Sequence, residues 1–191
     1  MEKNQEVTVN KEREVRTYAD MWHTSYCLLQ NGQEQIEGSY HQFLASLVFT
    51  AFTLEAYLNH IGPKVFRCWK DLERLGPKEK LNVISEKLGI EIDYSRRPWQ
   101  VLKQLFGFRN DIAHGKTVTI FKEETVKIQD YNDPKLRTFA ETTWEKYCTE
   151  KNAVRAREDV ENIVKTIHEA TKLEDEYPFV SGMQFSKASF F

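Results

Sequence analysis

Residues that would place this chain in several common protein classes are scarce. The 191 residues include only 8 Gly, 5 Pro and 3 Cys. So few turn-forming residues disfavour a sandwich of many short strands and favour long helices. The cysteines (Cys27, Cys68 and Cys148) are odd in number and far apart, so we expect reduced thiols rather than zinc ligands or a redox pair.

Long apolar runs are missing as well. A membrane-spanning helix needs roughly 18 apolar residues, and the best candidate, 43–61, is interrupted by Glu55, Asn59 and His60. Residues 1–16 are polar and charged, without the apolar segment of a signal peptide. We therefore expect a cytoplasmic protein that has no membrane partner.

The composition is that of one globular domain, with 40% hydrophobic and 29% charged residues. We expect a flexible N-terminus over 1–14, a single helical domain over 15–175, and an irregular, aromatic-rich tail over 176–191. Aromatic side chains in that tail indicate that part of it packs on another surface.

Charge is unevenly distributed along the chain. The net charge is −2, yet residues 60–116 hold 12 Lys and Arg against 7 Asp and Glu. A basic stretch of this kind can mark a surface that contacts phosphates. The alternative is that these lysines and arginines form the solvated face of a helix.

Hydrophobic periodicity predicts an all-α fold, an up-and-down bundle of about five helices. Helical patterns cover 15–36, 40–61, 64–72, 77–88, a stretch that starts at Pro98, and a stretch from Asp133 to Leu173 in which a break would fall near Lys151-Asn152. Gly62-Pro63 is expected to close the most apolar of these helices, 40–61.

The segment 116–130 differs from the rest. Residues 117–121 and 125–128 are β-branched and alternate in polarity, which predicts a small β-hairpin insertion, with a loop as the alternative.

The most specific feature is Arg109-Asn110-x-x-x-His114, at the end of an apolar helix and followed by Gly115. An Asn directly after the Arg makes a chance match much rarer than an Arg–His pair alone. Asn110 and His114 are four residues apart and share a helix face. Arg109 and His114 are five residues apart, which is about 140° around a regular helix. In a single copy of the motif, the two side chains would therefore meet poorly at one site.

These residues resemble the motif of HEPN domains (higher eukaryote and prokaryote nucleotide-binding), in which an Arg, often followed by a polar residue, precedes a His. The segment 52–59 also looks like the long central helix of many such proteins. The resemblance extends over about 40–173 as an order of helices, but only the motif and that helix are specific. It implies a bundle of four to five helices.

The resemblance also implies a function. Many HEPN proteins are metal-independent ribonucleases of toxin–antitoxin or antiviral systems, and many dimerise with two motifs facing each other. One branch is modified by its antitoxin on a Tyr two residues after the His, where this chain has Lys116. Regulation of that kind is therefore not expected.

The residue types suit cleavage of RNA by its own 2′-hydroxyl. His114 can act as base or acid, Arg109 can hold phosphate oxygens, and Asn110 can orient either group. We expect no cofactor and no metal, RNA as the substrate, a homodimer formed through the motif-bearing face, and an antitoxin or other regulatory protein as a further partner. The alternatives are that Arg109 only caps the helix end, or that the domain binds nucleotides or proteins without catalysis.

Further residues are assigned supporting roles. Glu55 and Asn59 lie on one face of an apolar helix, and a buried carboxylate needs a partner, so we expect Glu55 to approach Arg109 and hold its guanidinium. The alternative is that Glu55 is a surface residue. Side chains expected to contact RNA are those of Lys103, Lys116, Arg96 and Arg97.

Overall fold

The computed structural model describes residues 7–128, 133, 139–173 and 177–190. Its helices are α1 (Thr17–Glu34), α2 (Ser39–Val65), α3 (Trp69–Leu72), α4 (Pro77–Leu88), α5 (Val101–Ala113), α6 (Thr143–Tyr147) and α7 (Glu150–Thr171). Two strands, β1 (Val7–Arg13) and β2 (Gln184–Phe190), complete the described elements. The predicted all-α bundle is confirmed, since five of these helices have 12 or more residues.

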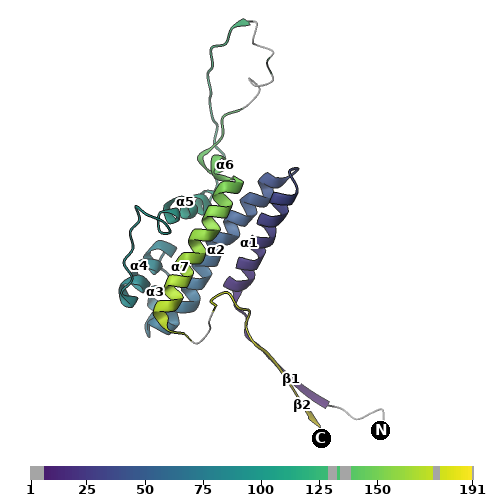
Figure 1. Cartoon of the computed structure of the whole chain (residues 1–191), viewed down its shortest axis with the longest axis vertical. Coiled ribbons are helices and arrows are strands. Elements are labelled where there is room, and N and C mark those ends of the chain that lie inside the picture. Colours follow the sequence, from purple (N-terminus) through teal and green to yellow (C-terminus); the bar gives the residue numbers. More distant parts are fainter. Residues whose placement is uncertain (1–6, 129–132, 134–138, 174–176, 191) are drawn as a thin grey trace.

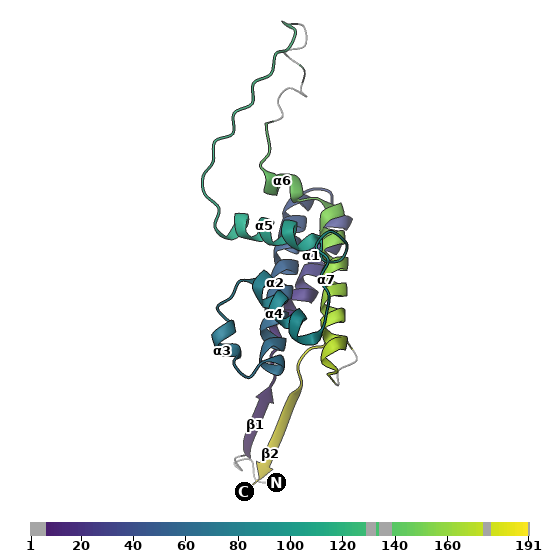
Figure 2. The same ribbon diagram turned by 90° about the vertical axis from the view of Figure 1, so that its left-hand side faces the viewer.

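The helical body is built around α2. Helices α1, α2 and α7 run side by side along the long axis of the molecule (Figure 1). Helix α5 runs across them, with α4 below it and α6 above it in Figure 2. Helix α2 contacts α1, α3, α4, α5 and α7, so it is covered on several sides. No helix in the described part of the chain has both the length and the apolar character needed to cross a membrane.

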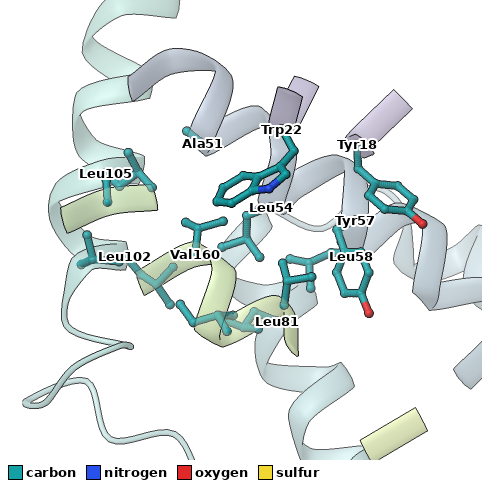
Figure 3. Close-up of a cluster of buried hydrophobic side chains, with 14 of the residues drawn as sticks. Tyr18, Trp22, Ala51, Leu54, Tyr57, Leu58, Leu81, Leu102, Leu105 and Val160 are labelled. Atoms are coloured by element: carbon teal, nitrogen blue, oxygen red, sulfur yellow. The ribbon is translucent and has the colours of Figure 1, made fainter. Parts of the chain in front are cut away.

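The core lies where these helices meet (Figure 3). Helix α2 supplies Leu47, Leu54, Tyr57, Leu58 and Ile61, all completely buried. Burying each such side chain contributes about 1.5–3 kcal/mol to folding. Helices α1, α4, α5 and α7 meet these residues with their own buried side chains, among them Trp22, Leu81, Leu105 and Val160.

A buried arginine joins α7 to α1. Arg157 Nη1 donates to the carbonyl oxygen of Trp22 at 3.0 Å and to the hydroxyl of Ser25. Its guanidinium lies 3.7 Å from the centre of the Trp22 ring. Desolvation lowers the pKa of Arg157 to about 10, so the group remains charged at neutral pH.

The end of α2 differs from the prediction. The helix does not close at Gly62-Pro63 but continues to Val65, with Pro63 in its last turn. Proline there gives up only its own N–H bond, and the Phe66 amide still donates to the Gly62 carbonyl at 2.8 Å. The helix expected over 64–72 is correspondingly reduced to α3, whose Trp69 packs against Gly62.

Other boundaries also shift. Helix α5 begins at Val101 rather than Pro98, which follows a cis peptide bond and a turn. The break near Lys151-Asn152 falls slightly earlier, between α6 and α7. The helix expected from Asp133 is wrong over residues 139–142, which are not helical, and α6 begins only at Thr143. Pro134 lies outside the described residues.

The segment after the motif forms no hairpin. Residues 117–127 form neither a helix nor a strand, so the alternative prediction of a loop is correct for them. This loop projects away from the helical body, as both views show (Figures 1 and 2). Several of its apolar side chains are exposed, Phe121 almost fully, and so is Ile128 directly after it.

The small sheet lies instead at the chain ends. Strand β1 pairs antiparallel with β2, from Val7 opposite Phe190 to Arg13 opposite Gln184. Strand β1 therefore takes up residues 7–13 of the segment expected to be flexible, and residues 1–6 lie outside the described residues. In the tail, residues 177–183 form neither helix nor strand, and β2 follows them. The expected packing of the tail aromatics is confirmed for Phe179, which stacks on Trp22 with ring centres 4.4 Å apart.

Two helical glycines provide a test of this packing. A Cβ on Gly62 would lie 2.3 Å from the Trp69 ring, whereas a Cβ on Gly107 would meet nothing within 4 Å. We expect Gly62→Ala to lower the free energy of unfolding by about 1–3 kcal/mol through overpacking. Gly107→Ala should raise it by about 0.5–1 kcal/mol, because Ala favours the helix. Thermal or urea unfolding measures both, and a stabilised Gly62→Ala would contradict the packing of α3.

Candidate functional site

The end of α5 presents the motif at the surface. The helix closes at Ala113, and the His114 amide still donates to the Asn110 carbonyl at 2.9 Å. The chain then turns away sharply at Gly115, where a Cβ would lie 2.9 Å from the Asp111 carbonyl oxygen. The His114 side chain is left exposed at the helix terminus.

Arg109 is held by α2. Its Nη2 donates to Glu55 Oε2 at 2.5 Å, and its guanidinium carbon lies 5.4 Å from the centre of the Phe52 ring. The predicted contact between Glu55 and Arg109 is therefore present. The two side chains are 24% and 20% exposed, so the pair is only partly screened by water. Arg109 Nε is buried and has no hydrogen-bond acceptor among the described residues.

Asn110 links this ion pair to the surface. Its Oδ1 accepts a hydrogen bond from Arg109 Nη1 at 2.9 Å. The same Asn110 lines a hollow of about 560 Å³, called here the His114 hollow. Its lining residues are Asn110, Asp111, His114, Gly115, Lys116, Val118, Thr142, Thr143 and Trp144. Arg109 is not among them, so a single copy brings Asn110 and His114 together at the hollow and leaves Arg109 behind Asn110.

The far wall of the His114 hollow is the start of α6. A capping box fixes it, since the Thr142 amide donates to Glu145 Oε2 at 2.7 Å and the Glu145 amide to Thr142 Oγ1 at 3.2 Å. Hydrogen bonds from the Thr142 hydroxyl and amide lower the pKa of the Glu145 carboxyl. The capping box could be predicted from the sequence, because Thr-x-x-Glu is a known helix-start pattern. Nothing in the sequence indicates that Trp144 lines the same hollow as His114.

Asn59 does not join the site. Its Oδ1 accepts a hydrogen bond from Lys80 Nζ at 2.8 Å. Lys80 is only 4% exposed, so its ammonium needs this acceptor. Asn59, expected to support the site together with Glu55, is thus bound to Lys80, because α4 rather than α5 covers that turn of α2.

The four predicted RNA contacts divide into two groups. Lys116 lines the His114 hollow, and Lys103 lines a second, larger hollow that Asn110 also borders. Arg97 instead anchors its loop to α7, donating to Glu158 at 2.9 Å and to Asp159 at 2.7 Å. These bonds raise the pKa of Arg97. Arg96 Nε lies 3.4 Å from Asp93 Oδ2.

Cation and carboxylate in the Arg109–Glu55 pair depend on each other. Glu55→Ala leaves a partly buried guanidinium uncompensated, so we expect the free energy of unfolding to fall by about 1–2 kcal/mol, and by less in Glu55→Gln, which keeps an acceptor.

Glu124→Ala is the matched control. It removes the carboxylate of a pair with Lys122 in which both side chains are more exposed, 43% and 42%. That change should stay within about 0.5 kcal/mol. Equal losses in Glu55→Ala and Glu124→Ala, measured by urea unfolding, would show that the Arg109 pair is an ordinary surface contact.

Among the residues that the structure describes, no group of three or more His, Cys, Asp or Glu side chains is placed to share a metal ion. No protein-family model, curated protein or solved structure matches the chain. The function must therefore be inferred from the end of α5 and the hollow beside it.

Proposed function

We propose that this protein is a metal-independent endoribonuclease that cuts RNA at the end of α5. One observation carries the proposal. An exposed His114, an amide at Asn110 and an ammonium at Lys116 share one hollow, and Asn110 is tied to the guanidinium of Arg109. These are the group types that phosphate-directed acid–base chemistry needs.

The reaction requires two proton transfers. In the first, an unprotonated His114 accepts the proton of the ribose 2′-hydroxyl, whose oxygen then forms a bond to phosphorus. In the second, a protonated group gives its proton to the 5′-oxygen as the bond from phosphorus to that oxygen breaks. The products are a 2′,3′-cyclic phosphate and a 5′-hydroxyl.

The second proton donor is proposed to be His114 of a second copy. A two-fold axis through the motif-bearing face would place two His114 side chains on one substrate. One would act as base and the other as acid, and two Lys116 side chains would flank the phosphate, while each Arg109 would hold its own Asn110.

The biological setting follows from the resemblance to HEPN domains and is proposed with it. A ribonuclease of this size would act in bacterial defence or as the toxin of a toxin–antitoxin pair, with an antitoxin or other regulatory protein as partner. Lys116 stands where one regulated branch has its modified Tyr, so control by modification of that position is not proposed.

A non-catalytic role is the second candidate, and one observation favours it. Arg109 is already paired with Glu55 and does not line the His114 hollow. In that case the motif would fix the end of α5, and the hollow would bind a nucleotide or a protein segment without cutting it.

Cleavage in vitro tests the first candidate. Purified wild-type protein incubated with end-labelled single-stranded RNA and EDTA should release products that end in a cyclic phosphate. His114→Ala should lose at least about 100-fold in rate, the usual contribution of a general acid or base. His41→Ala, which replaces an exposed histidine on α2, should cut normally. Cutting that EDTA abolishes, or that survives in His114→Ala, would contradict the proposed mechanism.

Growth distinguishes the two candidates in a cell. Induced expression of the wild type in a bacterium should slow growth, because cellular RNA would be cut, while His114→Ala at the same protein level should not. A non-catalytic module predicts the same growth curve for both strains. Immunoblots of the two strains provide the control for expression level.

A further inference from the structure

A second hollow adjoins the motif on the other side of Asn110. It has a volume of about 860 Å³ and lies between the start of α4, the connector at Tyr94 and the outer side of α5. We call it the α4–α5 groove, and the lining residues used below are Lys78, Tyr94, Lys103, Phe106, Asn110 and Arg155. Its volume lies within the range of pockets that hold small molecules of nucleotide size.

The groove carries net positive charge. Three cations, Lys78, Lys103 and Arg155, line it against one carboxylate, Glu79. Arg155 is partly engaged, since its Nη2 donates to Gln100 at 2.8 Å and its Nε lies 3.8 Å from Asp159. The ammonium of Lys103 is exposed. Such a surface attracts a phosphate backbone.

Two aromatic rings line the same groove. The Tyr94 ring is fixed at its tip, where the hydroxyl donates to Asn82 Oδ1 at 2.5 Å, and Lys78 Nζ lies 5.0 Å from its centre. Phe106 is half-buried in the wall formed by α5. Rings held in place in a basic groove are typical of sites that stack unpaired bases.

Asn110 connects the groove to the His114 hollow, because it lines both. A strand of nucleic acid that passes His114 can therefore continue along α5 without crossing the body of the protein. We propose that the α4–α5 groove binds a nucleotide of single-stranded RNA next to the bond cut at His114, with its base on Tyr94 or Phe106 and its phosphate on Lys103. This proposal rests on the proposed function and names its substrate as unpaired RNA.

Binding must be measured apart from cleavage to test the groove. The probe is a short fluorescein-labelled single-stranded RNA whose 2′-hydroxyls are methylated, so that the proposed reaction cannot cut it. Fluorescence anisotropy should show Tyr94→Ala binding about tenfold more weakly than wild type, the usual scale of one lost stacking contact. Lys103→Ala should also bind more weakly, and the difference should shrink at high salt.

The controls keep folding and position apart. Tyr94→Phe keeps the ring but loses its hydrogen bond to Asn82, so it should bind more tightly than Tyr94→Ala and no better than wild type. Thermal melting verifies that all variants are folded. Lys87→Ala, an exposed lysine on α4 outside the groove, and Tyr177→Ala, an exposed ring on another face, should leave affinity unchanged. The same probe annealed to its complement should bind more weakly, since paired bases cannot stack on protein rings.

Each outcome bears on one proposal. Unchanged affinity in folded Tyr94→Ala and Lys103→Ala overturns the groove even if RNA is cut. If affinity depends on Tyr94 and Lys103 but the unmethylated, end-labelled RNA is not cut, the groove remains a binding site and the proposed nuclease activity is overturned. No binding of the probe by wild type overturns the groove.

Discussion

The apolar surface of α2 is the constraint on which the rest of the structure depends. A helix that is hydrophobic most of the way round must be covered on several sides, and α1, α4, α5 and α7 provide that cover. Any polar group on such a helix must then be satisfied by whichever helix lies over it. Glu55 lies under α5 and meets Arg109, while Asn59, one turn further, lies under α4 and meets Lys80. The position of the motif is thus a consequence of how α2 is covered.

Two features of the structure could be predicted because each depends on only a few residues that the sequence shows. Helix α4 has the predicted bounds because Gly76-Pro77 starts it and Gly89, in the left-handed conformation, ends it. The contact between Glu55 and Arg109 was also predictable, because a carboxylate on an apolar helix needs a cation. In both cases a few residues that can be identified in the sequence determine which arrangement has the lower free energy.

What the sequence could not predict depends on partners distant along the chain. Pairing of β1 with β2 joins the two ends of the chain, and nothing in residues 7–13 indicates their partner. The partner of Asn59 depends on which helix covers α2 at that turn. At Pro63 the local rule failed because a proline in the last turn gives up only its own N–H bond, and the Phe66 amide still donates to the Gly62 carbonyl. The loop over 117–127 has the alternation of a hairpin but no strand pairing in the described residues.

A comparison of Arg157 with Arg109 shows what Arg109 can contribute. Arg157 is buried against a carbonyl, a hydroxyl and Trp22, and it serves to join helices. Arg109 is less buried, but its charge is compensated by Glu55, so its field at a nearby phosphate is weaker than that of a free cation. In the proposed reaction the positive charge at the phosphate cut at His114 therefore comes mainly from Lys116. Arg109 acts by position: Glu55 and Phe52 hold its guanidinium, the guanidinium holds Asn110, and Asn110 joins the hollow at His114 to the groove along α5.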